Sequence, residues 1–439
     1  MAQERKIGLF LATMLVTSNM VGSGIFLLPA TLAQFGSMTS VGWLIAAGGA
    51  LLVARVLGRL GRHAPEPGGA CAYAAEALGP YMGFQATSLY WVSCWTGNIA
   101  VAVAAVGYLA SFFPGMAAPW PLAVAAVAMI WGFTLLNLLG PRLVCQVESV
   151  ALFAGLVPIA IVVLGGWWRF HPALFLQSWN VSGKPALEAL PPSLVLMFWA
   201  FAGVESASIA TAVVANPSRN VPRATLYGVL IAAAIYLAST SLLMGMIPAA
   251  ALVRSTAPFA DAVRLLFGPA AGALVALMAL VKAAGSLGGW ILVTAQTGQA
   301  GAERGVFPRI FARLNRQGLP AANLAIAGVL MTVGVFATVS PTLGEQFGEL
   351  ISISVILMLL LYIYACLAVW HYAAQAPEAF RHDRAYAFAA MVFCVAVILL
   401  SGEKMLAWTA AAVFLTYPLY PLCRPRAGAS ATPSRGAGA

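Results

Sequence analysis

The stretch Ser18-Asn-Met-Val-Gly-Ser-Gly-Ile-Phe26 lies in the middle of a long apolar segment. Each glycine costs about 0.8–1.0 kcal/mol in a helix relative to alanine, so a Gly-Ser-Gly sequence disfavours a continuous helix here. Non-helical backbone at the depth of a bilayer centre is tolerated where it lines a cavity enclosed by protein. The stretch therefore predicts a broken membrane helix whose free backbone groups are available to a ligand.

The composition is that of an integral membrane protein. Of the 439 residues, 62% are hydrophobic and 8% are charged, and the mean hydropathy is +0.90. Long apolar runs without period-2 alternation exclude a β-barrel, so each span is expected to be a helix. Twelve segments are long enough, or nearly so, to cross about 30 Å of hydrocarbon: Ile7–Leu32, Val41–Leu60, Met82–Phe113, Trp120–Leu139, Val147–Trp168, Leu190–Val213, Leu226–Ile247, Ala270–Ala300, Ala322–Val339, Leu350–Trp370, Ala385–Leu400 and Met405–Leu422.

The positions of the basic residues predict the orientation. An even number of spans places both termini on one side, and with a cytoplasmic N-terminus most Lys and Arg residues fall on cytoplasmic flanks: Arg5, Lys6, Arg55, Arg59, Arg62, Arg142, Arg219, Arg223, Arg304, Arg309, Arg313, Arg316, Arg381, Arg384, Arg424, Arg426 and Arg435. Fewer fall outside: Arg169, Lys184, Arg254, Arg264 and Lys404. The positive-inside rule therefore predicts a multi-pass protein of the bacterial inner membrane with both termini in the cytoplasm. The same spread explains the net charge of +10 without a nucleic acid partner.

A second break is predicted at Trp199-Ala-Phe-Ala-Gly-Val-Glu-Ser-Ala-Ser208, which places a glycine, a glutamate and serines inside the sixth span. The two breaks fall in the first and sixth spans, the same position in each set of five. Paired discontinuous helices are typical of inverted-repeat transporters that bind substrate near the midplane. Glycines in membrane helices also serve as close-packing contacts, but the matched second break favours a functional site.

Other classes of protein fit less well. The six cysteines show no disulfide framework, the four histidines lie on flanks, and no phosphate-binding loop or metal-spaced cluster indicates an enzyme or a cofactor. A channel would need repeated filter carbonyls or charged rings. The residues Met1–Ala33 also resemble a signal peptide loosely, but the apolar run is too long. Residues 424–439 are rich in small and basic residues and are predicted to be a disordered cytoplasmic tail.

Several motifs resemble the amino acid/polyamine/organocation superfamily, and within it the bacterial basic amino acid/polyamine antiporters, nearest to the arginine/agmatine antiporters of acid resistance. The resemblance runs from about Lys6 to Leu422. Its motifs are Gly22-Ser-Gly-Ile-Phe26, Pro67-Gly-Gly-Ala-Cys-Ala-Tyr73, Leu89-Tyr-Trp-Val-Ser-Cys-Trp-Thr-Gly-Asn98, Trp199-Ala-Phe-Ala-Gly-Val-Glu-Ser206, Asn216-Pro-Ser-Arg-Asn-Val-Pro222 and Gly285-Ser-Leu-Gly-Gly-Trp290.

This resemblance implies an all-α, leucine-transporter-like fold. Residues 7–168 and 190–370 are then two inverted five-helix repeats with discontinuous helices 1 and 6, and residues 385–422 are two further helices that commonly form a homodimer contact. The implied activity is exchange of a cationic amino acid for its decarboxylated amine by alternating access. Arginine and agmatine are the expected pair, and ornithine/putrescine or lysine/cadaverine is the alternative.

The resemblance also implies roles for single residues. Ser23 and Gly24 match positions that hold the substrate carboxylate, which fits the positive N-terminal end of a half-helix. The backbone carbonyls of three further positions are implied to receive the α-amino group: Met20, Trp199 and Ala202. Side chains of the pocket are implied at Asn19, Ser93, Cys94, Asn98, Trp290 and Ser354. An outer, pH-sensing gate matches Tyr90, Glu205 and Tyr362.

Trp199 and Trp290 stand out among the twelve tryptophans because both are expected in mid-span beside glycine breaks. An indole there can lie against a substrate cation. Departures from the family are Ser93 and Ala202, which predict a roomier and more polar pocket, and Lys282. A lysine inside a span costs about 2.5–3.5 kcal/mol near its centre. Either Lys282 reaches to the outer surface, or it is paired or neutral, with Glu205 as a candidate partner, and tunes substrate charge or proton coupling.

Overall fold

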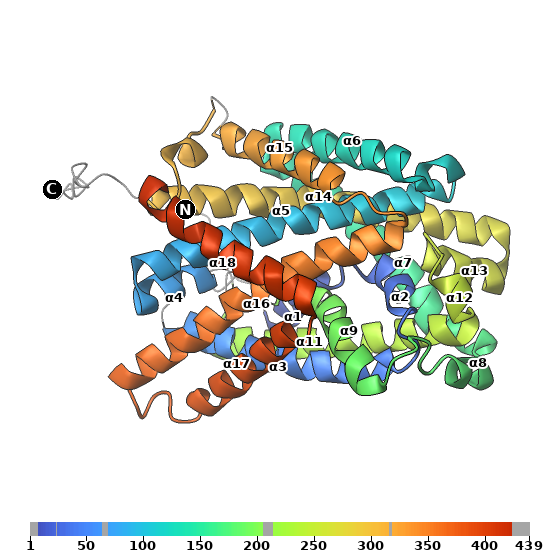
Figure 1. The fold of residues 1–439 in the computed structure, drawn as a ribbon, viewed down its shortest axis with the longest axis horizontal. Coiled ribbons are helices and arrows are strands. Elements are labelled where there is room, and N and C mark those ends of the chain that lie inside the picture. Colours follow the sequence, from blue (N-terminus) through green and yellow to red (C-terminus); the bar gives the residue numbers. More distant parts are fainter. Residues whose placement is uncertain (1–7, 23, 64–68, 205–213, 316–317, 424–439) are drawn as a thin grey trace.

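The computed structural model describes residues 8–22, 24–63, 69–204, 214–315 and 318–423, and within these ranges every regular element is helical (Figure 1). The α-helices are α1 (Leu9–Met20), α2 (Gly24–Leu32), α3 (Thr39–His63), α4 (Gly69–Leu78), α5 (Pro80–Ala110), α6 (Pro119–Leu138), α7 (Pro141–Gly165), α8 (Pro172–Gln177), α9 (Ala186–Trp199), α11 (Pro217–Met246), α12 (Ala249–Leu252), α13 (Pro258–Phe267), α14 (Pro269–Glu303), α15 (Ala321–Ala337), α16 (Leu343–Gln375), α17 (Asp383–Leu399) and α18 (Glu403–Cys423). Short 3₁₀ helices cover Pro114–Ala117, Gly166–Arg169 and Arg309–Ala312.

The long helices form one bundle around α5. This helix packs most extensively against α14 and α16, and α14 packs in turn against α7. In Figure 1, α6 and α15 lie along one edge of the bundle, while α3 and α17 lie at the opposite edge. Because α5 is surrounded, it is the most completely buried of the long apolar helices, and its polar side chains face other helices. The prediction of an all-helical fold is confirmed for this part of the chain.

Seven of the described helices are long and apolar enough to cross a membrane, and the total is eight if α17 and α18, which meet at a bend of 115°, are counted as one span. The helices α9 and α15 are apolar but shorter. Within the described residues, each sequence-predicted segment contains a helix, and the first contains two helices separated by a break. The total of twelve spans stays a prediction.

Two of the central helices begin in the same way. A Gly-Pro pair separates the short helix α4 from α5 and the short helix α13 from α14. Gly79 has φ 95° and ψ 171°, and Gly268 has φ 88° and ψ 177°, a conformation that side chains rarely adopt. The following proline then starts the long helix, where its missing N–H costs no hydrogen bond.

The first predicted break is confirmed. Helix α1 ends at Met20 and α2 begins at Gly24. The N–H of Val21 still reaches the carbonyl of Thr17, whereas the N–H of Gly22 turns back to the carbonyl of Met20. Consequently the first N–H groups of α2 and the last carbonyls of α1 lack partners within a continuous helix.

The sixth segment also stops being helical where the sequence predicted. Helix α9 ends at Trp199, and a series of turns follows over residues 200–204, in which Gly203 has φ 101°. Residues 205–213, which complete the predicted break, lie outside the described residues.

Two buried tyrosines support the helices next to the breaks. The hydroxyl of Tyr108 on α5 donates to the carbonyl of Phe26 on α2, and the hydroxyl of Tyr236 on α11 donates to the carbonyl of Ala200, each over 2.8 Å. The rings of Trp43 and Phe201 pack on Tyr236, at centroid distances of 5.1 and 5.5 Å. Both tyrosines are fully buried, so each bond is shielded from water.

We expect Tyr108→Phe to lower the free energy of unfolding by about 1–3 kcal/mol, because it leaves a carbonyl of α2 buried without its donor. The measurement is thermal unfolding of the purified protein in detergent. Tyr227→Phe is the control, since this ring is 45% exposed. An equal, small shift for both variants would contradict a supporting role for Tyr108.

Candidate functional site

Trp199 connects the two breaks. It is the last residue of α9, and its indole lies against the start of α2: a Cβ added to Gly24 would be 2.5 Å from the indole Nε1. The other end of the ring reaches α5, where a Cβ added to Gly97 would be 2.6 Å from Cη2 and 3.3 Å from the hydroxyl of Ser354 on α16. Glycine is therefore required at both positions for the indole to lie where it does, and four helices meet around this ring.

One residue beyond Gly97, Asn98 faces α14. Its Nδ2 donates to the hydroxyl of Thr294 over 3.0 Å, and that hydroxyl donates to the carbonyl of Trp290 over 2.8 Å. The Oδ1 of Asn98 is buried and has no hydrogen-bond partner among the described residues. A buried acceptor of this kind is costly unless it accepts a hydrogen bond. This one belongs to the residue that follows Gly97, on which Trp199 packs.

Asn137 and Asn323 also leave an Oδ1 without a partner, so the feature is not confined to Asn98. Those two asparagines bind backbone carbonyls of α14 through Nδ2 and lie where α6 and α15 pack on that helix. Asn98 differs in its position, because it is adjacent to both the Trp199 contact and the turn of α14 that carries Trp290.

Ser93 and Ser354 bind each other. The hydroxyl of Ser93 donates to the Ser354 carbonyl over 2.8 Å, and the hydroxyl of Ser354 donates to the Ser93 carbonyl over 2.7 Å. Both side chains are buried. These reciprocal bonds hold α5 to α16 directly beside Trp199, so the extra polar atom at Ser93 joins two helices.

Further predicted residues lie on the helices and turns around Trp199 and Asn98. Met20 and Ala202 are buried at the ends of α1 and in the turns after α9, and Cys94 lies one turn before Asn98. Tyr362 is buried on α16 and its ring packs on Phe198, next to Trp199, while Tyr90 is buried on α5. Ser23 and Glu205 lie outside the described residues, as does the side chain of Asn19.

The expectation that Trp290 stands beside a helix break is wrong. Helix α14 is continuous from Pro269 to Glu303, and Trp290 is a partly exposed residue in its middle. The glycines before it serve packing instead: a Cβ on Gly285 would be 2.2 Å from the Cβ of Ala151, and a Cβ on Gly289 would be 2.7 Å from the carboxyl atoms of Glu148. Both contacts come from α7, which crosses α14 closely here.

Lys282 lies at the same helix contact. It is 4% exposed, and its aliphatic chain covers Gly155 of α7, where an added Cβ would be 2.4 Å from its Cγ. The lysine therefore does not extend to the outer surface. Its charged neighbour is Glu148 on α7, although the two form no direct salt bridge among the described residues. Glu205, the partner considered from the sequence, lies outside those residues.

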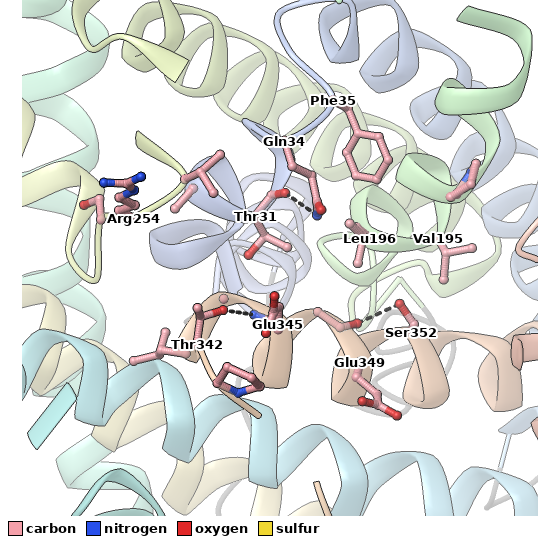
Figure 2. A pocket seen from close by; sticks show the side chains of 18 of the residues that line it. Thr31, Gln34, Phe35, Val195, Leu196, Arg254, Thr342, Glu345, Glu349 and Ser352 are labelled. Carbon is pink, nitrogen blue, oxygen red and sulfur yellow. Dashed lines mark hydrogen bonds between the residues drawn. The ribbon is translucent and has the colours of Figure 1, made fainter. Parts of the chain in front are cut away.

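A cavity of about 700 Å³ opens between α2, α9 and α16. Figure 2 shows Thr31, Gln34 and Leu196 on one side of it and Glu345, Glu349 and Ser352 on the other, with Arg254 at one end. Leu196 lies one turn before Trp199, and Ser352 is two residues before Ser354, so the cavity approaches the site along α9 and α16. The carboxylate of Glu349 is bound by Lys404 over 2.7 Å.

Some residues at the site gave no usable signal in the sequence. Tyr108, Tyr236 and Thr294 look like ordinary polar residues of membrane helices, and only the fold brings each to its acceptor. Glu148 did have a signal, as a carboxylate close to an apolar run. It is the second residue of the predicted span Val147–Trp168, whereas α7 begins six residues earlier, at Pro141, so the carboxylate lies further inside the helix than the apolar run alone indicates.

A bundle of apolar helices in which one helix breaks between Met20 and Gly24, and another ends at the tryptophan that packs on this break, is typical of a membrane transporter. No group of three or more potential metal ligands occurs among the described residues. The chain matches the profile of the amino acid permease family over residues 7–427, and it belongs to that family.

Individual relatives indicate to which branch of this family the chain belongs. The chain is 38% identical to the cadaverine/lysine antiporter of Escherichia coli K12 over 371 residues, 83% of each chain. It is 32% identical to the putrescine transporter PotE of the same organism over 428 residues, which cover 97% of this chain and 98% of the relative. The identity to PotE of Haemophilus influenzae is also 32%, over 422 residues, 95% and 97% of the two chains. Membership of the basic amino acid/polyamine antiporters is thus confirmed, and the protein is a transporter and not an enzyme.

We expect Glu148→Gln to destabilise the protein by about 3 kcal/mol, the cost of an uncompensated charge inside a membrane helix bundle. Adding Lys282→Met should restore most of this loss, because the double variant no longer contains a buried charge. Thermal unfolding of the four proteins in detergent measures the coupling.

The ion pair of the exposed Lys404 with the half-buried Glu349 provides the matched control for this cycle. The same changes there, Lys404→Met and Glu349→Gln, should show a coupling below about 1 kcal/mol. If the losses at Lys282 and Glu148 simply add, the two residues do not compensate each other.

Proposed function

We propose that this protein exchanges a cationic amino acid for the amine formed by its decarboxylation, across the bacterial inner membrane and with both termini in the cytoplasm. The observation that carries the proposal is the break between α1 and α2, with Trp199 lying on Gly24. N–H groups at the start of a helix such as α2 suit a carboxylate. The carbonyls at the ends of α1 and α9 accept only short-range bonds from the turns that follow, and their second lone pairs suit an α-amino group. A zwitterionic head group matches both.

In this proposal the head group lies between the two breaks. Ser23 and Gly24 hold the carboxylate, and the carbonyls of Met20, Trp199 and Ala202 receive the α-amino group. An amine product lacks the carboxylate and makes only the second set of contacts. Exchange of the two substrates then follows naturally, because they share one site.

The distal cation is assigned to the space between α5 and α14. The unpartnered Oδ1 of Asn98 is an acceptor for an ammonium or a guanidinium, and the partly exposed indole of Trp290 offers a ring face to either. Cys94 lies on the same face of α5 as Asn98, four residues earlier. Asn19, Ser93 and Ser354 complete the pocket, Ser93 and Ser354 by holding its helices together.

The relatives favour lysine and cadaverine as the exchanged pair, with putrescine as a further amine. Arginine and agmatine are the second candidate. The observation in their favour is the combination of Trp290 with an amide acceptor, which suits a planar guanidinium.

Alternating access is assigned to two five-helix repeats, residues 7–168 and 190–370, within twelve spans. Support comes from a local pattern that occurs twice, in which a short helix and a Gly-Pro pair precede a long helix. The long helices of this pattern, α5 and α14, occupy the third position in each of the two assigned repeats. The cavity in Figure 2 serves as the outer vestibule, with Trp199 closing its inner end and Tyr90, Tyr362 and Glu205 forming a gate that responds to pH. Residues 385–422 provide the contact of a homodimer.

Proteoliposomes test the exchange. We expect labelled lysine to enter vesicles loaded with cadaverine or putrescine and to remain outside empty vesicles, since an exchanger needs a counter-substrate. Parallel vesicles with labelled arginine and internal agmatine distinguish the two candidate pairs. Equal uptake into empty and loaded vesicles would contradict exchange and indicate a channel or uniporter.

Trp290→Leu tests the assigned cation site. We expect 2- to 30-fold weaker binding of the transported amino acid and of its amine, corresponding to about 0.5–2 kcal/mol of cation–π stabilisation. Isothermal titration of purified protein measures it, and Trp120→Leu is the control because that indole is 65% exposed. Unchanged binding of both substrates to Trp290→Leu would rule out this ring.

A further inference from the structure

A second cavity, of about 530 Å³, lies between α3, α11 and the start of α17, well apart in sequence from the residues of the substrate site. Four arginines line it: Arg55, Arg59 and Arg62 from α3, and Arg223 from α11. The three arginines of α3 are spaced by four and three residues, so they share one face of the helix. A cluster of guanidinium groups is unsuited to a cationic substrate, and this cavity therefore requires another explanation.

The positive charge is only partly compensated. Asp383 binds both Arg55, over 3.3 Å, and Arg59, over 2.9 Å. Arg59 also donates to the carbonyl of Ala379, and Arg55 lies 4.1 Å from the ring centroid of Tyr386. Arg62 and Arg223 make no ion pair or hydrogen bond within the residues that the structure describes. One carboxylate thus faces four guanidinium groups, and two of these are available to an anion.

The shape of the cavity selects the kind of anion. Its lining on α3 runs from Gly48 to Arg62, a length of about 21 Å along the axis. The basic residues occupy the end near the helix terminus, whereas Leu51 and Leu52 line the part that reaches deeper into the membrane. Leu226 continues this apolar lining on α11, one turn deeper than Arg223. A charged end followed by an apolar trough matches a phosphate group joined to an acyl chain.

We propose that this cavity binds an anionic phospholipid, with the phosphate between Arg62 and Arg223 and an acyl chain along the leucines. Basic pockets between membrane helices are suited to such head groups. Under the predicted orientation, the lipid belongs to the cytoplasmic leaflet. Because α3, α11 and α17 come from different parts of the chain, the bound lipid stabilises their packing without touching the substrate.

The test uses the full-length protein purified in detergent and titrated with dioleoylphosphatidylglycerol, dioleoylphosphatidylcholine or inorganic phosphate. Native mass spectrometry counts bound lipid, and thermal unfolding measures its effect. We expect saturable binding and a raised Tm with phosphatidylglycerol only. A comparable rise with inorganic phosphate would overturn the proposal in favour of a soluble anion, and one with phosphatidylcholine would show that the phosphate charge is not recognised.

Variants locate the site. The double variant Arg62→Gln/Arg223→Gln should weaken phosphatidylglycerol binding by about 10- to 30-fold, whereas Arg62→Lys/Arg223→Lys should retain most of it. Arg309→Gln/Arg313→Gln removes the same charge from a basic flank outside the cavity and should have little effect. Equal weakening by both glutamine pairs would overturn the site and leave a general attraction to anionic lipid. Lipid-free Tm values of the variants verify that each is folded.

Discussion

Inside a membrane, every backbone N–H and carbonyl must find a partner within the protein, and the whole architecture follows from where this requirement is relaxed. The chain interrupts its helices after Met20 and after Trp199. Each interruption leaves polar backbone that no lipid can satisfy. Tyr108 and Tyr236 each bind one carbonyl near a break, and Trp199 covers the start of α2. The carbonyls of Met20 and Trp199 each accept one hydrogen bond from the turn that follows them, and the second lone pair of each is assigned to the substrate.

Polar side chains in the bundle separate into two kinds. Ser93 and Ser354 form reciprocal hydrogen bonds that hold α5 against α16. Asn98 uses its donor on Thr294 and keeps its acceptor free beside the Trp199 contact. Because a free acceptor is costly in a dry interior, its location next to the breaks is a physical argument for a ligand there. The charged residues follow the same logic, since Lys282 is buried opposite Glu148 and not at random in the bundle.

The comparison of Gly22-Ser-Gly24 with Gly285–Gly289 shows how far local sequence can be interpreted. Both are glycine-rich stretches in apolar segments, and both were expected to lie at helix breaks. Only the first does. In α14 the glycines instead allow Ala151 and Glu148 of α7 to pack closely against the helix backbone. The helix continues because this packing compensates for the low helix propensity of glycine. Nothing within the two stretches themselves distinguishes these outcomes.

Local features of the sequence were enough to predict the membrane class, the approximate positions of the long helices and the place of the first break. These depend on the length of an apolar run, the helix propensity of glycine and the position of proline. The sequence also indicated which residues would meet, through motifs shared with a family. Only the tertiary structure decided that Lys282 faces Glu148, that Thr294 joins Asn98 to Trp290, and that the arginines of α3 and α11 line one cavity. The physical reason is that each of these contacts joins helices distant in the chain, and their relative rotation is set by the packing of the whole bundle.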